Sequence, residues 1–589
     1  MTEISSLRPI AAVLVSAVAI GPILLSGSRP NLRESWTFLA GVLKFGIVAS
    51  MVPGVLAGDA YVTDLGAFLP LPGADPIRFA LEVDALGLLF GLLASLLWIV
   101  TSSYSVGYMR GLDEHAQTRY FAAFAASLSA AMGVAFASNL IVLFVFYELL
   151  TVATYPLVAH DETDEARAAG RKYLAYTFGG GVAVLAGTAL VYWLTGTVAF
   201  TSGGIDGLAA ADPAMARLAF ALLAGGFGVK AALMPLHSWL PDAMVAPTPV
   251  SALLHAVAVV KSGVFGIARV VLDVFGPETV GNLGMGLPLA AVAAFTLTVA
   301  SVIALRQDNL KRRLAFSTVS QLSYIVLGLA VLTPTSIVGG LLHIPAHAFM
   351  KITLFFAAGA IHVETHTDDI SEMAGIGRRM PLTMTAFAVA AAGMAGIPLI
   401  AGFVSKYFLL IGSVSAGQTL FAVALLVSGV LNVAYFWPIV YTAFFESPEE
   451  TDEKPLIEGP LGGRLAWGRA AVADAERDPL AEAADDDDTD AVADGGEAHD
   501  RDGDTDRDGD TDRDGDTDRD GDRAHDRDDD SHAGGWERRG WTGGESTWFM
   551  LGPILTVALG SVVLGLVPDA AVFLRVVRLV VEAVTGVAV

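Results

Sequence analysis

The stretch VKAALMPLHSWLPDAMVAPTPVSALLHAVAVVKSGVFGIAR, Val229 to Arg269, places ionisable side chains inside strongly apolar sequence. Lys230 precedes Pro235 by five residues, and Lys261 follows a mainly apolar run. Proline removes a backbone donor and breaks a helix. A charged residue at the centre of a bilayer costs about 2.5–3.5 kcal/mol on insertion scales, so it normally faces a partner or a water-filled cavity. We therefore predict a membrane helix that is interrupted beside Lys230.

The composition of the whole chain agrees with a membrane protein. Hydrophobic residues make up 54% of the 589 residues, and the mean hydropathy is +0.57. The chain has no cysteine, which excludes disulfides and cysteine-ligated iron-sulfur clusters or zinc. The net charge of -25 belongs to one region, since residues 446–545 hold 35 of the 61 acidic residues and only 12 of the 36 basic ones. The remaining chain is nearly neutral.

Apolar segments long enough to cross a bilayer, about 20 residues each, recur along the chain. They predict about fourteen membrane helices at 9–27, 37–58, 84–108, 119–138, 140–159, 173–195, 216–240, 250–274, 284–305, 314–332, 337–361, 382–410, 418–445 and 547–567. The first has no small-residue cleavage site, so we expect it to be retained. After Pro568, an amphipathic stretch with Arg575 and Arg578 is expected to lie along the membrane interface.

Basic residues in short loops predict the orientation, because such loops stay on the cytoplasmic side. Loops after odd-numbered helices hold Arg29, Arg33, Arg110, Arg119, Arg167, Arg171, Lys172, Arg306, Lys311, Arg312, Arg313, Arg378 and Arg379. Loops after even-numbered helices hold almost none, with Arg78 as the exception. We expect a multi-pass protein of the cell membrane, with both termini outside and the acidic insert in the cytoplasm.

The acidic insert has a low-complexity sequence that cannot bury a core. The hexamer DTDRDG occurs three times, beginning at Asp504, Asp510 and Asp516, and it matches the first half of a calcium loop. However, Gly515 stands at the position where the first such loop needs a bidentate glutamate. We interpret the insert as a solvated linker, whose acidity would suit a salt-rich cytoplasm and a halophilic source.

A series of ionisable residues lies inside the predicted membrane helices. Its members are Glu148 in FVFYELLTVATYPL, Lys230, His237, His255, Lys261, His343, His347, Lys351 and Lys406. His343, His347 and Lys351 are four residues apart and so line one helix face, which predicts a proton wire. His255 alone fits a hydrogen bond between helices equally well. Lys44 is close enough to a helix end to reach the interface, so we leave it out.

Two of these lysines lie beside predicted helix breaks. Lys230 precedes Pro235, and Lys406 follows Gly396, Pro398 and Gly402. Interrupted helices at corresponding places in two halves mark the ion sites of inverted-repeat transporters, although a packing kink is the alternative. Desolvation favours a neutral lysine and a nearby carboxylate favours a charged one, so a Glu148–Lys230 pair could hold or release a proton. Alanine at either position should then abolish transport.

Several strings resemble the antiporter-like subunits shared by Mrp-type multisubunit sodium/proton antiporters and the membrane arm of respiratory complex I. These strings are FYELL, the Val229–Arg269 stretch, RQDNLKRRLAFSTVSQLSYIVLGL, HAFMKITLFFAAGAI and GIPLIAGFVSK, and the likeness covers roughly residues 80–445. The resemblance implies an all-α polytopic fold with fourteen helices, two inverted five-helix repeats, and broken helices 7 and 12. It also implies a hetero-oligomeric assembly.

The family's relay residues are carried over where they match. By resemblance, Glu148 and Lys230 form the first pair, Lys261 is the central lysine, His347 and Lys351 belong to the helix-11 region, and Lys406 is the terminal group. His237 and His343 complete the relay that we expect. A D-type Mrp subunit is the expected member, because the chain ends soon after helix 14, although APTPVSALLHA is similar to the A-type as well.

The resemblance also suggests boundaries. We expect N-terminal helices in 1–110, repeats in 111–275 and 276–446, the insert in 447–546, and a last helix with the interfacial segment in 547–589. The HVETHTDD segment, His362 to Asp369, has metal-ligand residue types but no strong spacing, so we interpret it as a solvated loop. Glu82 and Asp84 are interpreted as a helix N-terminal cap.

Three functional classes remain. The first is a secondary transporter subunit that exchanges Na⁺ for H⁺, with the bilayer and other subunits as partners and with no nucleic acid, cofactor or metal site. The second is a proton-pumping subunit of a redox complex, in which other chains handle electrons. The third is an anchor or calcium-responsive module built on the insert, which unchanged transport after deletion of residues 450–545 would rule out.

Overall fold

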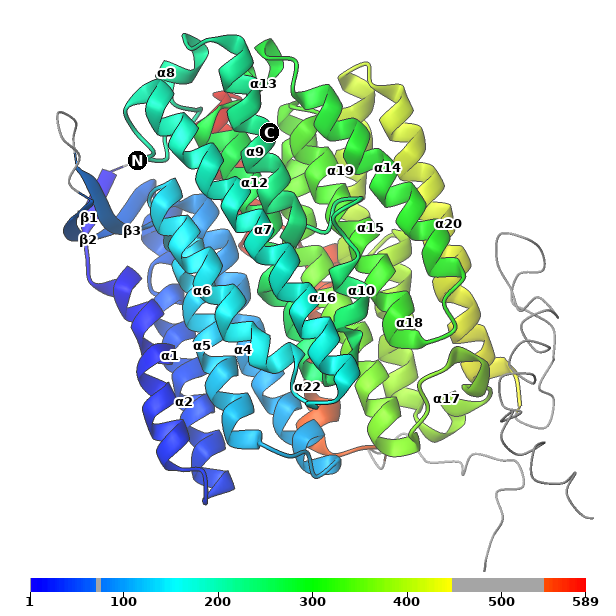
Figure 1. Ribbon diagram of the computed structural model, residues 1–589. Coiled ribbons are helices and arrows are strands. Elements are labelled where there is room, and N and C mark those ends of the chain that lie inside the picture. Colours follow the sequence, from blue (N-terminus) through cyan, green and yellow to red (C-terminus); the bar gives the residue numbers. More distant parts are fainter. Residues whose placement is uncertain (1, 70–75, 448–544) are drawn as a thin grey trace, which may run out of the picture. The chain divides into compact units, whose positions relative to one another are not determined.

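The computed structural model describes residues 2–69, 76–447 and 545–589, and most of these residues form helices (Figure 1). The helices are α1 Arg8–Leu25, α2 Pro30–Ala49, α3 Val52–Leu56, α4 Ala85–Gly111, α5 Gln117–Phe136, α6 Leu140–Val158, α7 Asp164–Thr195, α8 Asp206–Ala209, α9 Pro213–Lys230, α10 Trp239–Asp242, α11 Thr248–Ala252, α12 Val259–Arg269, α13 Pro277–Asn282, α14 Gly286–Leu305, α15 Leu310–Ala330, α16 Pro334–Thr365, α17 Ile376–Arg379, α18 Pro381–Ala395, α19 Ala401–Ser415, α20 Thr419–Phe445, α22 Trp548–Leu566 and α23 Phe573–Thr585. Short π-helical turns, Leu253–Val257 and Val270–Val274, flank α12. The aspartate-rich hexamers and the linker that we predict lie outside the described residues.

Twelve helices in the described ranges are long and apolar enough to cross a membrane. The shorter apolar helices α18 and α19 together correspond to the predicted span at 382–410, and α9 corresponds to the one at 216–240. The chain is thus an all-α polytopic membrane protein with about 12–14 apolar helices, apart from one small sheet. The central helices α12, α15 and α16 are buried almost throughout, so they form the interior of the helix bundle.

A three-stranded sheet next to α1 was missed by the sequence analysis. Strand β1, Thr2–Ser5, pairs in parallel with β2, Asp59–Leu69, which pairs antiparallel with β3, Ile77–Val83 (Figure 1). These strands lie between or before the long apolar segments. The strands were not predicted, because their short alternating patterns do not reach the length of the membrane-spanning segments that the hydropathy pattern reveals.

The interpretation of Asp84 as a helix cap is confirmed, whereas Glu82 lies in strand β3 and is not part of the cap. The backbone N–H of Gly87 donates to Asp84 Oδ1 over 2.7 Å at the start of α4. Asp84 also accepts two bonds from Arg269 of α12, over 2.7 and 2.8 Å, and Arg269 donates a further bond of 2.8 Å to Asp273. The cap therefore also joins the start of α4 to the end of α12.

Both helices that we predict to be interrupted are broken, the first directly after Lys230 and the second before Lys406, which lies in α19. α9 ends at Lys230, and the chain runs through non-helical turns until α10 begins at Trp239. α18 ends at Ala395, and α19 begins at Ala401. Because Pro235 and Pro398 lie in the two interruptions, the missing backbone donors explain why neither helix continues.

The last two helices are held by contacts that the sequence did not reveal. Glu545, just before α22, accepts the backbone N–H of Leu382 and Thr383 at the start of α18. A carboxylate at a helix N-terminus satisfies donors that have no partner inside the helix. The amphipathic stretch after Pro568 is α23, and its buried face, including Val576 and Val577, packs on α4 and α16. Protein thus covers the apolar face that we expected at the membrane interface.

The interpretation of Lys44 as an interfacial side chain was wrong. Lys44 on α2 is fully buried, and its Nζ lies 4.9 Å from the centroid of the Trp98 ring on α4. Its amine has no hydrogen-bond partner among the described residues. Its distance from the helix end suggested snorkelling, but α4 packs over this part of α2 and encloses the side chain.

Candidate functional site

The predicted first pair, Glu148 and Lys230, comes from two neighbouring regions of the bundle. Lys230 at the last residue of α9 is fully buried, and its Nζ donates to the Tyr147 carbonyl of α6 over 2.6 Å. The same amine lies 3.4 Å from the centroid of the Tyr147 ring. Glu148 is the next residue on α6, and its charge acts on Lys230 without an ion pair between them. The pair is therefore present in an open arrangement.

Glu148 occupies a space that a glycine leaves free. Both carboxylate oxygens are buried, and neither has a hydrogen-bond partner among the described residues. A Cβ placed on Gly181 of α7 would collide with Glu148 Oε1. A buried polar group without a partner costs about 1–3 kcal/mol. This carboxylate is thus free to accept a proton or the Lys230 amine.

α9 and α12 approach each other closely between Lys230 and Lys261. A Cβ on Gly263 would collide with the backbone at Lys230 and Ala231, so this glycine permits the contact. Two residues earlier, Lys261 is fully buried, and its Nζ lies 2.7 Å from His347 Nδ1 of α16. α12 thus packs against the end of α9 at Gly263 and reaches the histidines of α16 through Lys261.

α16 carries the stripe of His343, His347 and Lys351, all fully buried. The rings of His343 and His347 lie 6.1 Å apart between centroids. His343 Nδ1 lies 2.8 Å from Ser405 Oγ, and its Nε2 lies 2.9 Å from Gln321 Oε1. The stripe therefore has polar partners on both α15 and α19.

Lys351 continues the stripe towards the start of α15. Its Nζ donates to the Leu314 carbonyl over 2.9 Å and to the Ser317 hydroxyl. About one helical turn before Leu314, Lys311 and Arg312 line a pocket together with Lys172, Asp242 and Asp368. Lys351 therefore lies between the histidines and a pocket lined by charged residues.

Lys406 lies at the other end of the row. Its Nζ donates to the Met394 carbonyl, near the end of α18, and lies 4.8 Å from the centroid of the Tyr324 ring. The Tyr324 ring stacks on His343 with centroids 5.5 Å apart. Tyr324 thus separates Lys406 from the histidine stripe by a single side chain.

The two remaining histidines lie beside this row. His237 is half-buried in the turns after α9, and its ring centroid lies 6.3 Å from that of Phe316. His255 is fully buried against Phe355, and neither ring nitrogen has a hydrogen-bond partner within the described ranges. The interhelical hydrogen bond considered for His255 is therefore not what the structure shows.

The HVETHTDD segment pairs internally. His362 Nδ1 lies 3.0 Å from Asp368 Oδ1. Burial alone would raise the pKa of the Asp368 carboxyl, but the hydrogen bond and charge of His362 hold that pKa below its usual range. The segment thus has an internal ion pair.

Sequence analysis missed the neutral groups of the site. Tyr147, Gln321, Tyr324 and Ser405 provide the contacts between the charged residues. Gln321 and Ser405 were detectable as polar residues in apolar runs, but their pairing with His343 depends on how α15, α16 and α19 pack.

Comparisons with known proteins agree with this architecture. A family model described as NADH:quinone oxidoreductase/Mrp antiporter, TM matches residues 137–432. The NADH-quinone oxidoreductase subunit N of Desulforudis audaxviator is 33% identical over 461 residues, which are 76% of this chain and 90% of that protein. A probable K(+)/H(+) antiporter subunit of Rhizobium meliloti is 31% identical over 439 residues, which are 72% of this chain but only 42% of that protein. A chain in the structure of the Mrp complex from Dietzia sp. has the same fold, with a TM-score of 0.72 at 22% identity over 99% of this chain and 98% of that chain.

Proposed function

The chain belongs to the NADH:quinone oxidoreductase/Mrp antiporter family, and on this premise we propose that it is the ion-translocating subunit of a multisubunit monovalent cation/proton antiporter. Protons move along Glu148, Lys230, Lys261, His347, His343 and Lys406, and Lys351 is the branch through which they enter from the cytoplasm. His237 lies beside the path, in the turns that follow Lys230. The chain is a secondary transporter subunit, which uses the energy of one ion gradient to move another ion.

The observation that carries this proposal is the chain of contacts from Lys261 to Lys406. Lys261 touches His347, His347 neighbours His343, and Tyr324 lies between His343 and Lys406. Ionisable residues inside a membrane are expensive and usually mark an ion or proton path. Hydrogen bonds that only hold helices together would not require α12, α16 and α19 each to contribute ionisable side chains to one row.

Lys351 and the pocket beside it suggest where protons enter. The pocket is lined by three basic and three acidic side chains: Lys172, Lys311, Arg312, Glu165, Asp242 and Asp368. In the orientation that the basic loops predict, this end of α15 faces the cytoplasm. We place the cytoplasmic entrance of the path here, with Lys351 as its first buried group.

The open Glu148–Lys230 pair supplies the control element. Two opposite charges attract more strongly as they approach in a medium of low dielectric constant. Closing the pair holds a proton on Lys230, and opening it allows that proton to pass towards Lys261. A charge on one residue of the row changes the proton affinity of the next residue. The arrival of a proton at one end therefore favours the release of a proton at the other end.

The two interrupted helices support an inverted-repeat arrangement. α9 ends at a lysine in the first half, and the break between α18 and α19 is reached by a lysine in the second half. Residues 111–275 and 276–446 would form the two repeats around these breaks. The N-terminal helices, the last helix and the acidic insert lie outside them.

A redox-driven proton pump is the second candidate. The similarity to one component of NADH-quinone oxidoreductase over 90% of that protein's length favours it. The same row would then move protons, and partner chains would supply the driving force. The two candidates differ in whether a cation gradient alone drives proton movement.

Vesicles that contain the chain with its partner subunits distinguish the two functions. A pulse of Na⁺, or of K⁺ in a parallel experiment, should dissipate an imposed pH gradient without any electron donor. The cation whose pulse dissipates the pH gradient is the one that the complex exchanges for protons. If neither cation moves protons through the complete complex, cation/proton antiport is contradicted and the redox-driven candidate replaces it.

Lys406→Ala should abolish the exchange in these vesicles. Without the amine, the row ends at His343 and Tyr324. The Lys406 amine is the group that contacts both the Tyr324 ring and the Met394 carbonyl near the end of α18. Tyr407→Phe on the same helix is the matched control, since Tyr407 is half exposed and outside the row. Wild-type exchange by the Lys406→Ala complex would remove this lysine from the path.

A further inference from the structure

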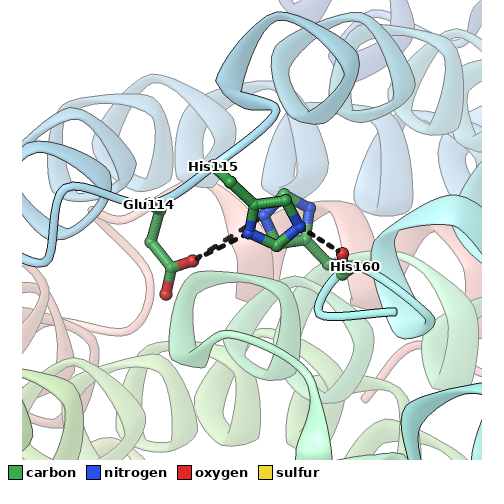
Figure 2. A group of neighbouring side chains, drawn as sticks. All are labelled: Glu114, His115 and His160. Carbon is green, nitrogen blue, oxygen red and sulfur yellow. Dashed lines mark hydrogen bonds and ion pairs between the residues drawn. The ribbon is translucent and has the colours of Figure 1, made fainter. Parts of the chain in front are cut away.

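Two loops meet beside the charged pocket and bring three metal-ligating side chains together. Glu114 and His115 come from the turn between α4 and α5, and His160 comes from the turn between α6 and α7. Figure 2 shows the two imidazole rings lying over each other, with the Glu114 carboxylate directed towards them. One ligand atom from each of the three residues lies within 4.8 Å of the other two.

The distances fit a small divalent ion. Glu114 Oε2 lies 3.8 Å from His115 Nδ1 and 3.9 Å from His160 Nε2. Nitrogen and oxygen ligands lie about 2.0–2.2 Å from zinc, so two ligands of a tetrahedral ion are on the order of 3.4 Å apart. The carboxylate is therefore within about 0.5 Å of the ligand spacing of a tetrahedral ion from each imidazole nitrogen.

The hydrogen bond of His115 leaves the correct nitrogen free. His115 Nε2 lies 3.0 Å from the His160 carbonyl oxygen, and a carbonyl can only accept. Nε2 therefore carries the hydrogen, and Nδ1 presents its lone pair towards Glu114. Metal-ligating histidines typically donate their other N–H to such an oxygen, which fixes the tautomer and the ring orientation.

His160 provides independent support for a ligand. Its side chain is fully buried, and neither ring nitrogen has a hydrogen-bond partner among the described residues. A neutral imidazole with an unused lone pair is the form that binds metal ions.

We propose that Glu114, His115 and His160 bind a divalent transition-metal cation of the Zn²⁺ class, with a fourth position open to water. The two imidazole nitrogens favour such a cation over Ca²⁺, Mg²⁺, Na⁺ and K⁺, which prefer oxygen ligands. The site is accessible, because the side chains of His115 and Glu114 are 51% and 20% exposed. The bound ion would tie the α4–α5 turn to the α6–α7 turn.

The site lies outside the proton row, but it is close to the entrance pocket. Lys311 and His362 both act electrostatically on Glu114. Lys311 also lines the pocket. The binding proposal does not depend on the transport proposal, because it concerns different side chains and has its own measurement.

The test uses the purified full-length chain in detergent, titrated with Zn²⁺ and separately with Co²⁺. Histidines and aspartates of the acidic insert, including His499, His525 and His532, add the same background binding to every variant. His160→Gln and Glu114→Gln should each remove one tight Zn²⁺ site and weaken Zn²⁺ binding by more than about tenfold. Loss of a group that only supports a metal ligand already costs about 10–100-fold in metal affinity. The visible absorption of tetrahedral Co²⁺ should disappear with that site.

A double variant, His362→Gln with His366→Asn, is the matched control. These two histidines lie in the neighbouring HVETHTDD segment, with ring centroids 6.0 Å apart, and their loss should leave the tight site intact. Glu114 is only partly buried, so Glu114→Gln keeps the test decisive if His160→Gln unfolds. Equal Zn²⁺ uptake by wild type and Glu114→Gln, or loss of the site in the control, overturns the proposal.

Discussion

Replacement of Lys230 with methionine should reduce cation/proton exchange by at least about tenfold, which corresponds to a barrier higher by about 1.4 kcal/mol. Methionine keeps most of the volume of the side chain but carries no proton. Because Lys230 contacts Tyr147 and responds to Glu148 at one end of the row, its loss removes both a proton carrier and the control element. The measurement is the Na⁺-driven or K⁺-driven dissipation of a pH gradient in vesicles that contain the assembled complex.

Lys44→Met provides a closely matched control. Lys44 is also fully buried and also lies against an aromatic ring, but it belongs to α2, which packs mainly on α1, α4 and α5, helices that carry no member of the row. It should therefore leave the exchange rate close to wild type. If both methionine variants lose exchange equally, burial of a lysine rather than its place in the row determines the effect, and the assignment of Lys230 fails.

Removal of the Arg269 side chain should destabilise the protein by about 3–5 kcal/mol, the usual penalty for leaving a buried charge without its partner. Arg269 is 3% exposed and bonds both Asp84 and Asp273, so Arg269→Ala would leave two carboxylates together with no cation. The start of α4 would also lose its link to α12. The expected result is a lower unfolding temperature in detergent, followed by tryptophan fluorescence.

Arg578→Ala is the control for this stability measurement. Arg578 also forms an arginine–aspartate pair, with Asp569 over 2.7 Å, but both side chains are substantially exposed. Exposed pairs contribute about 0–1 kcal/mol, so this variant should unfold close to wild type. Similar unfolding temperatures for the two variants would contradict the structural role of the Asp84–Arg269–Asp273 cluster.

The sequence was sufficient for the features that depend on local chemistry. Long apolar segments identified the membrane helices, because the bilayer requires a minimum length. Prolines at positions 235 and 398 identified the interruptions, because proline lacks a backbone N–H donor whatever the helix packs against. The cap by Asp84 was predictable for the same reason, since it involves only the first turn of its own helix.

Features that depend on packing between distant segments were not predictable. Lys44 was placed at the interface, but its burial results from the position of Trp98 on another helix. The Arg269 cluster joins residues 185 positions apart. The pairing of Gln321 and Ser405 with His343, and the meeting of Glu114 and His115 with His160, likewise depend on which helices and turns become neighbours.

The most direct test of the proton row is proton flux through a complex that carries Lys261→Met. Lys261 of α12 contacts the α16 stripe at His347, and Gly263, two residues further along α12, packs against the end of α9. Proton movement driven by a cation gradient should fall to the level of vesicles without the complex, while the variant still assembles with its partner subunits. Wild-type proton flux through a fully assembled Lys261→Met complex would show that protons do not follow this row.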